Sequence, residues 1–348
     1  MSLTEDKRER IKFYLMEKIF LDRSKELVEK TAENFGISKQ SVYNYLKELI
    51  VTGKVHKDKN GKYTLGRVVS KKYSYQLKET MLDEDMIFER TMFPHICQFE
   101  DNTVRIWRYA FTEMVNNVLD HSEAEQLSIY IGQNELYTWV NIVDDGIGIF
   151  KKIADYYDYH TLDDAIISLF KGKLTTDSEN HSGEGIFFTS RVMDHYAAIS
   201  GNKIFSQNNT SDKIYDIEES GNTSSFQKYK DAKGTIIVMG LTNHTQKTLR
   251  EVFDMYSNDD GGFTITSIPM KMVCDGGYPV SRSQAKRLYF GFDKFEKVIL
   301  DFSGVDEIGQ GFAHELFCVF RRRHPEIEIE CIHTNEAINK MINHVTRD

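Results

Sequence analysis

An apolar strand pattern that runs directly into acidic and glycine residues offers the clearest candidate chemistry in this sequence. The run LYTWVNIVDDGIGIF places Asp144 at the end of a predicted strand, followed by Gly146 and Gly148. A carboxylate fixed at a strand end can accept a hydrogen bond from the exocyclic amine of a purine, and the glycines let the backbone turn tightly beneath the base. The pattern indicates a purine site, although loops after strands often carry such residues.

Polar side chains also recur along a predicted helix, FTEMVNNVLDHS, at residues 111–122. Glu113, Asn117 and Asp120 fall at three- and four-residue spacing, which places them on one stripe, and His121 lies one turn beyond Asn117. Asn is a poor helix former, so two consecutive Asn residues require a compensating role. The stripe faces either water or a ligand.

Two further motifs suit phosphate and base contacts. The run HSGEGIFFTSRVMDHY supplies Gly183 and Gly185 immediately before an amphipathic helix pattern, where backbone N–H groups can close on phosphate oxygens. The strand pattern KGTIIVMGL begins with Gly234 and Thr235. The four separate segments are therefore expected to surround one nucleotide.

In their order and separation, these motifs resemble the boxes of the GHKL family, the histidine-kinase-like ATPases, over about half of the chain. The resemblance implies an α/β sandwich that binds ATP under a mobile lid. It also implies that Asn117 holds the magnesium ion bridging the phosphates, and that Glu113 is a general base for water or an acceptor hydroxyl. The implied ATP-binding residues are Asn117, His121, Asp144, Gly146, Gly148, Lys173, Gly183, Gly185 and Thr235.

Within that family, the stretch LTTDSENHSGEGIFFTSRVMD looks like the bacterial anti-sigma-factor serine kinases, in which a Thr-Thr lid precedes the glycine run. This sequence departs from them at Ile186, which two Phe residues follow, and in a longer lid at about residues 150–182. Lys171 and Lys173 lie in this lid, where each is expected either to reach phosphate charge or to stay solvated.

Residues 1–67 predict three helices, at about residues 5–21, 25–35 and 39–51, and a hairpin turning at Asn60-Gly61. This arrangement resembles a winged helix-turn-helix, in which the third helix enters the major groove of DNA and the hairpin follows the phosphate backbone. A protein-contact or dimerisation role is the alternative. The expected DNA-binding residues are Lys39, Gln40, Tyr43, Asn44 and Lys47 on the third helix, with Lys57, Lys59 and Lys62 on the hairpin.

Residues 262–348 alternate strand and helix patterns, which favours a small α/β domain. The run VILDFSGVDEIGQGFAHELF resembles STAS-like domains, and specifically the uncharacterised STAS-like group that accompanies such ATP domains. Their better-known relatives carry a phosphoacceptor Ser in a turn that here reads Ile308-Gly309-Gln310-Gly311, without a hydroxyl. Phosphorylation of this domain by its own chain is therefore not expected, whereas docking of a protein partner is.

The predicted organisation is a multidomain α+β protein: winged helix (1–67), connector (68–82), GHKL-type ATP-binding domain (83–255) and STAS-like domain (262–348). The connector is left open as a strand or a linker, and residues 202–233 are expected to form a hairpin excursion between sheet strands. His95 follows Pro94, a poor setting for a phosphoacceptor on a helix, so histidine autophosphorylation is not expected.

Composition limits the partners. The formal net charge is −9, which argues against a protein that coats nucleic acid, although residues 1–67 carry 15 Lys and Arg against 10 Asp and Glu, a balance of +5. The cysteines show no paired spacing for zinc or disulfides. No signal peptide or long apolar run is present, so a cytoplasmic location without membrane contact is expected.

The function expected from these features is that of an ATP-binding regulator. ATP and magnesium binding would control contacts with double-stranded DNA, with a protein partner, or with both. The alternatives are a protein serine/threonine kinase or a slow ATPase, and a homodimer is left open.

Overall fold

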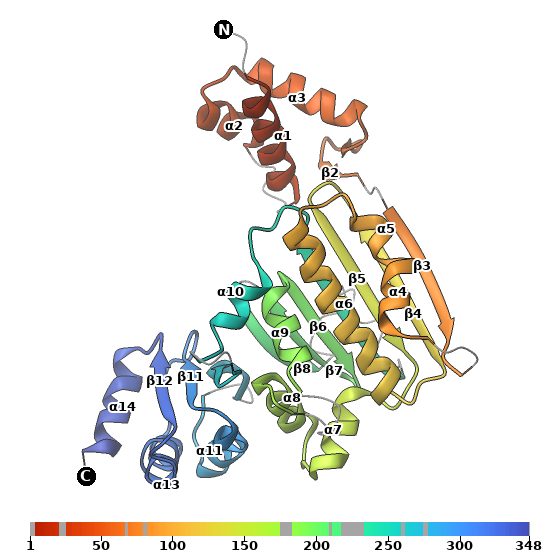
Figure 1. The fold of residues 1–348 in the computed structure, drawn as a ribbon. Coiled ribbons are helices and arrows are strands. Elements are labelled where there is room, and N and C mark those ends of the chain that lie inside the picture. The colour runs from red at the N-terminus through yellow and green to blue at the C-terminus, as the bar shows by residue number, and fades with distance from the viewer. Residues whose placement is uncertain are drawn as a thin grey trace. The chain divides into compact units, whose positions relative to one another are not determined.

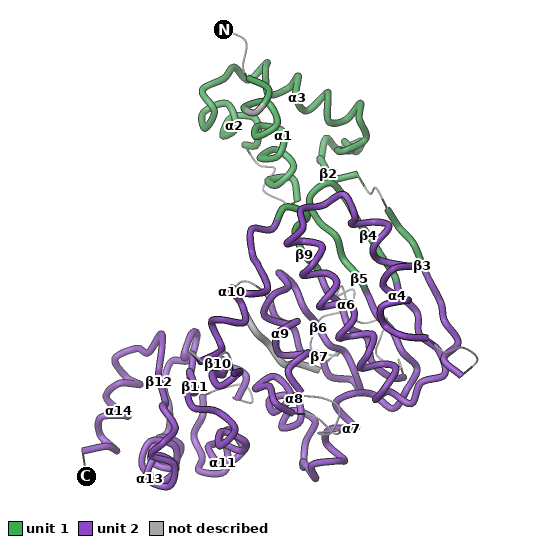
Figure 2. Tube along the Cα trace, viewed as in Figure 1, with its two compact units in different colours: residues 1–72, 130–140, 240–244 green, residues 73–129, 141–239, 245–348 purple. Residues whose placement is uncertain are grey.

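The computed structural model describes residues 4–20, 26–66, 69–78, 82–174, 183–208, 211–216, 233–258, 262–273 and 278–347. Helices and sheets are mixed along the chain, as the sequence predicted (Figure 1). The chain divides into two compact units (Figure 2). Unit 1 contains Met1–Lys72, Tyr130–Val140 and Gly240–His244, and unit 2 contains Tyr73–Ile129, Asn141–Met239 and Thr245–Asp348.

Unit 1 begins with three helices, α1 (Glu5–Phe20), α2 (Leu27–Phe35) and α3 (Lys39–Val51). Gly36 ends α2 in the left-handed conformation, and the Ser38 side chain caps α3 by accepting a hydrogen bond from the backbone N–H three residues on. The apolar faces of the helices share one core, which includes Ile11, Leu15, Val42, Leu46 and Leu49.

An antiparallel hairpin follows, with β1 (Val55–Lys57) paired to β2 (Tyr63–Leu65). The predicted hairpin is present, but its loop is longer than a two-residue turn. Asp58 organises this loop, since its Oδ1 accepts hydrogen bonds from the N–H groups of Asn60 at 2.9 Å and Lys62 at 2.8 Å.

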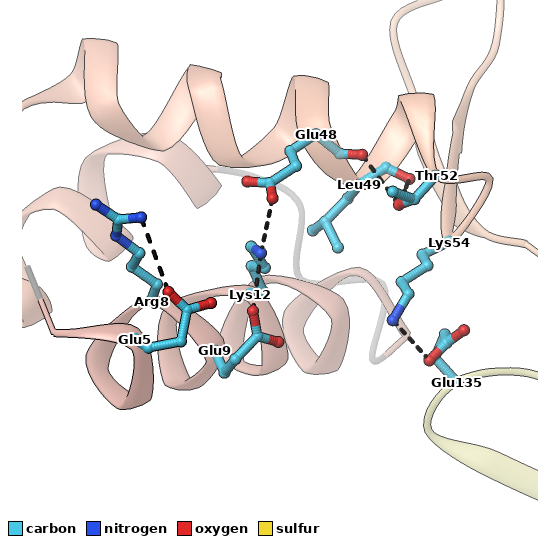
Figure 3. Close-up of polar contacts among 9 residues, drawn as sticks. All are labelled: Glu5, Arg8, Glu9, Lys12, Glu48, Leu49, Thr52, Lys54 and Glu135. Carbon is cyan, nitrogen blue, oxygen red and sulfur yellow. Dashed lines mark hydrogen bonds and ion pairs between the residues drawn. The ribbon is translucent and has the colours of Figure 1, made fainter.

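Residues far along the chain complete the core of unit 1. Leu136 is buried in the same cluster as the apolar side chains of the helices. Phe20 at the end of α1 stacks on Tyr137, with ring centroids 5.1 Å apart. Lys54, just before β1, forms an ion pair with Glu135 at 3.1 Å (Figure 3). The core of unit 1 therefore includes residues beyond the helices and the hairpin.

The described strands of the central sheet number seven, in the order β3-β4-β5-β9-β6-β7-β8. The connector, left open between strand and linker, contains the edge strand β3. The expected hairpin excursion is present as antiparallel β7 and β8, and residues 217–232 lie outside the described part. The strand bounds are β3 (Val69–Gln76), β4 (Gln126–Gln133), β5 (Tyr137–Asp144), β6 (His195–Ser200), β7 (Lys203–Asn208), β8 (Ser211–Asp216) and β9 (Thr235–Thr242).

In unit 2, helices α4 (Glu84–Thr91), α6 (Asp101–His121) and α9 (Gly185–Val192) lie side by side on one face of this sheet (Figure 1). The buried side of α6 carries Trp107, Phe111 and Met114. Three short helices join these elements, α5 (Phe93–Ile96), α7 (Ile149–Tyr157) and α8 (Leu162–Lys171).

The C-terminal part of unit 2 follows α10 (Leu249–Asp254) and contains a parallel sheet, β10-β11-β12. Its strands and helices alternate along the chain, as the sequence predicted. The stretch GQGFAHELFCVFRRR is helical from Gln310 on, and one π-helical turn, Glu315–Phe320, interrupts it. The bounds are β10 (Ile265–Pro269), η3 (Met270–Val273), α11 (Arg282–Tyr289), η4 (Phe292–Lys294), β11 (Lys297–Asp301), α12 (Gln310–His314), η5 (the π-helical turn), α13 (Arg321–Arg323), β12 (Glu328–Ile332) and α14 (Glu336–Thr346).

Candidate functional site

A cavity of about 330 Å³ opens in unit 2 among α6, α7, α9 and the adjoining ends of β5 and β9. Eight of the sequence-predicted site residues line it, and they come from four separate segments of the chain. Gly146 and Lys173 are not among the lining residues, and Asp120 is exposed on α6. The predicted residues in the lining are Glu113, Asn117, His121, Asp144, Gly148, Gly183, Gly185 and Thr235.

Helix α6 brings its polar stripe to the cavity because its opposite side is held in the core. Asn117 lies in the wall of the cavity, and its Nδ2 is buried without a hydrogen-bond partner among the described residues. Buried polar atoms in native proteins are nearly always hydrogen-bonded, so an orphaned amide in a cavity wall fits a ligand that completes its bonding. The orphaned Nδ2 is a donor and suits a phosphate oxygen, whereas Oδ1 of the same amide is the kind of oxygen ligand that Mg²⁺ takes together with phosphates, so the residue fits a nucleotide-bound ion.

Asp144 ends strand β5 with 3% of its surface exposed. Burial raises the pKa of this carboxyl group to about 6, although hydrogen bonds from Gly146 and Thr235 oppose that shift. The Gly146 N–H donates to Oδ1 at 2.9 Å. The Thr235 hydroxyl accepts the Ile149 N–H at 3.0 Å, so the same residue holds both the carboxylate and the start of α7.

Close backbone approach explains the glycines around Asp144. A Cβ at Gly146 would lie 2.0 Å from the carbonyl oxygen of Ser122, at the end of α6. Gly234 has a φ of +75°, and a Cβ there would lie 2.5 Å from Oδ1 of Asp144. No larger residue fits either position without moving the backbone. Gly146 therefore shapes the site from outside the cavity lining.

Asp145, the second acid of the motif, has a structural role. Its Oδ1 accepts hydrogen bonds from the N–H groups of Glu125 and Gln126, each at 2.9 Å, and so fixes the start of β4. Only the first carboxylate of the pair lines the cavity.

Lys152 on α7 is the functional candidate that the sequence motifs missed. It is the only Lys or Arg among the described residues that line the cavity. Its Nζ donates to the carbonyl oxygen of His121 at 2.7 Å, at the C-terminal end of α6. The signal in the sequence is its position four residues after Gly148, one helical turn into α7.

Lys173 points away from the cavity that it was predicted to line. Its Nζ donates to the carbonyl oxygen of Lys294 at 2.8 Å, and the ammonium group lies over the rings of Phe263 and Phe295. Lys171 is likewise buried against the C-terminal part of unit 2. Lys171 is therefore not solvated, contrary to the second expectation, whereas Lys173 is half-exposed.

The predicted DNA-binding side chains form one exposed face of α3 in unit 1: Lys39, Gln40, Tyr43, Asn44 and Lys47. Lys39 forms an ion pair with Glu29 of α2 at 2.7 Å, and this hydrogen bond raises the lysine pKa. The hairpin lysines Lys57, Lys59 and Lys62 are exposed as well.

Comparison with protein families found one match. Residues 284–339 match the STAS-like domain of unknown function (DUF4325). The C-terminal part of the chain is therefore STAS-like, as the sequence indicated. Comparisons with curated proteins and with solved structures found no match.

The described residues contain neither a membrane-spanning helix nor a cluster of metal-binding side chains. None of the described helices is long and apolar enough to cross a membrane. No group of three or more His, Cys, Asp or Glu side chains in the described ranges could hold a metal ion by itself. A metal at the cavity would thus need oxygens from a ligand in addition to Asn117.

Proposed function

We propose that the cavity of unit 2 binds ATP with magnesium, in the manner of the GHKL family that the motifs resemble. The observation that carries this proposal is the convergence of two groups on one cavity: the amide of Asn117 from α6, whose Nδ2 has no hydrogen-bond partner among the described residues, and the buried carboxylate of Asp144 from β5. An acceptor for the adenine amine and a ligand for the phosphate-bound ion are the two contacts that such a nucleotide requires.

The remaining lining residues fit the other parts of a nucleotide. Gly183 lies just before α9 and Gly185 is its first residue, and the first N–H groups of this helix suit phosphate oxygens. Lys152 supplies a positive charge in a lining that also holds two carboxylates. Met114, Ile153 and Ile186 provide apolar surface for a base or ribose.

Calorimetric titration with Mg²⁺–ATP tests this function. Asn117→Ala is expected to weaken binding by about tenfold or more, because the ion and its phosphates lose a ligand, while the circular dichroism spectrum stays unchanged. Asn339→Ala is a matched control, since Asn339 is an exposed helical Asn on α14. Equal binding by both variants would contradict the proposal.

We further propose that the nucleotide site serves regulation. The N-terminal helices and hairpin resemble a winged helix-turn-helix, and its reading face is exposed on α3. The STAS-like region belongs to a class of domains that mediate protein contacts. A nucleotide site that accompanies a DNA-binding type of module and a partner-binding type of module favours a transcriptional regulator or a partner-switching protein.

The position of Glu113 supports an enzymatic alternative, either slow ATP hydrolysis or phosphoryl transfer to a Ser or Thr of another protein. This carboxylate lines the cavity at the start of α9, where it could take the proton of an attacking hydroxyl. Incubation with ATP labelled on its γ-phosphate separates the possibilities. Free phosphate indicates hydrolysis, a labelled protein indicates transfer, and unreacted nucleotide indicates a binding switch.

A further inference from the structure

One wall of the cavity is also a contact surface for the C-terminal part of unit 2 from Phe263 onward, which we call the STAS-like region because its residues 284–339 match that family. Leu169 on α8 and Leu174 three residues after its end both line the cavity. The residues between them, Lys171 to Lys173, carry side chains and backbone groups that bond to the segment 263–295. We call residues 169–174 the shared wall.

Lys171 is the most deeply held residue of the shared wall, with 3% of its surface exposed. Its Nζ donates to the carbonyl oxygens of Phe290 at 3.1 Å and Arg287 at 3.3 Å, at the C-terminal end of α11. Its own carbonyl oxygen accepts the Thr266 hydroxyl at 2.7 Å. The last carbonyl groups of a helix lack intrahelical donors, so Lys171 supplies hydrogen bonds that α11 cannot form by itself.

The next two residues, Gly172 and Lys173, also contact the C-terminal part of unit 2. Lys173 and Lys294 exchange hydrogen bonds, each ammonium group donating to the other residue's carbonyl oxygen, at 2.8 Å and 2.9 Å. Gly172, with a φ of +89°, leaves room for the ring of Phe263, because a Cβ there would lie 2.7 Å from that ring. The Phe263 ring therefore packs directly against the backbone of Gly172.

An ion pair ties α8 to the same helix of the STAS-like region. Arg287 Nε lies 2.9 Å from Oδ1 of Asp164, whose side chain is only 12% exposed. Burial lowers the pKa of Lys171 to about 7, yet a neutral amine keeps the N–H groups that these contacts use. The docking therefore involves both ends of α8.

The shared wall is short, and it contacts the STAS-like region on one side and the cavity on the other. A displacement on the first side is therefore expected to move the second. Leu174 follows Lys171 by three residues, and Gly183, another lining residue, packs on its backbone so closely that a Cβ would lie 2.6 Å away. A movement of α11 relative to α8 would reach the cavity through this stretch, since packed segments transmit strain rather than dissipate it.

We propose that the STAS-like region regulates the nucleotide cavity by fixing the shared wall, with Lys171 as the positioning residue. A partner that binds the STAS-like region and shifts α11 would change how long the nucleotide stays bound. The effect of such a partner on nucleotide binding rests on the proposed nucleotide function, whereas the fixing of the wall does not.

Two measurements on the full chain test the proposal. Amide hydrogen exchange of residues 169–174, without nucleotide, reports whether the STAS-like region fixes the wall. Mg²⁺–ATP affinity reports whether the cavity depends on it. Lys294→Met is the first variant because Lys294 is exposed and its loss should spare the fold. Lys171→Met is the second, and Lys297→Met is the control, since Lys297 pairs with Glu328 and Glu330 within the STAS-like sheet.

We expect both variants to speed exchange of the wall and to raise the Kd for Mg²⁺–ATP by about fivefold or more, the usual effect of losing one hydrogen bond, with the control unchanged. Unchanged exchange in both variants overturns the proposal. Faster exchange with unchanged nucleotide affinity overturns the regulatory half. If the parent protein binds no Mg²⁺–ATP, the proposed function fails, and the exchange data alone then decide whether the wall is fixed.

Discussion

The carboxylate of Glu113 lies against the backbone of Gly185, so that a Cβ at Gly185 would be 1.9 Å from Oε2 of Glu113. Gly185→Ala should therefore push the carboxylate or the start of α9 out of position and weaken Mg²⁺–ATP binding by about tenfold or more, the scale of a displaced site. Isothermal titration measures the change.

A double variant makes this test specific. Adding Glu113→Ala to Gly185→Ala removes the atoms that collide, so the double variant should bind nucleotide better than Gly185→Ala alone. Gly262→Ala is the matched control, because Gly262 has no positive φ and a Cβ there would make only ordinary contacts, the nearest at 3.5 Å from Oδ1 of Asn258. Failure of the second substitution to restore any affinity would show that the collision is not what matters.

Asp144→Asn should make the protein more stable and bind nucleotide less well. The pKa of Asp144 is raised to about 6 by burial, so the folded protein holds a proton there more tightly than the unfolded chain does. Stability then falls as pH rises from about 4 to 6, and the ionised group costs roughly 3 kcal/mol above that window. Thermal unfolding at pH 7 and at pH 4.5 measures this: the gain from Asn should be large at pH 7 and small at pH 4.5.

The same titration predicts the pH dependence of binding. Mg²⁺–ATP affinity of the parent protein should fall as pH drops through 6, because the neutral carboxyl group is a weaker acceptor for the adenine amine than the carboxylate is. Asp145→Asn should not reproduce this pH dependence, since Asp145 accepts hydrogen bonds from the start of β4 and does not line the cavity. A binding curve that is flat between pH 5 and 7 would exclude Asp144 from the site.

The titration of Lys171 should make the free energy of unfolding depend on pH in the alkaline range. Burial lowers its pKa to about 7, with Asp164 acting against the shift and Lys294 adding to it. Between that value and the unfolded pKa of 10.5, the unfolded chain binds more protons, so this residue makes stability rise with pH. The difference in unfolding free energy between the parent and Lys171→Met should therefore grow in favour of the parent from pH 7 to 10. A constant difference would mean that the lysine keeps an ordinary pKa.

The ion pair on the predicted reading face gives a test of DNA binding. Glu29 holds Lys39 at 2.7 Å, so Glu29→Gln should free the lysine and tighten DNA binding, whereas Lys47→Glu should weaken it and flatten the salt dependence by about one phosphate contact or more. Gel shifts at several salt concentrations measure both effects. Glu5→Gln serves as the control for removing a negative charge from unit 1. If the parent protein shifts no DNA, the face is better assigned to protein contacts.

The sequence-based predictions are most accurate for residues whose positions depend only on the local structure around them. Asp144 and the glycines near it occupy a strand end and a turn that the short run DDGIG specifies by itself, and the stripe from Glu113 to His121 follows from helical spacing alone. The caps at Gly36 and Ser38 are local in the same sense. These residues required no knowledge of tertiary contacts.

Predictions that depend on distant partners were less complete. Lys173 was expected at the phosphates or in water, but its direction is set by Lys294 and two Phe rings far along the chain. Lys152 was missed because its four-residue spacing from Gly148 indicates the cavity only once α7 is known to begin at Ile149. The connector containing β3 was ambiguous, since KKYSYQ lacks Gly and Pro signals and only pairing in the sheet makes it a strand.

The buried position of Leu136 has a practical consequence for dissecting the protein. A fragment that stops after the hairpin would expose the apolar surface that Leu136 covers, and it would leave Phe20 without its stacking partner. Loss of that contact is worth about 2 kcal/mol or more in a small domain, which is enough to unfold a marginal one. Weak or absent DNA binding by such a truncated piece would then report on its folding, and tests of the reading face belong in the intact polypeptide.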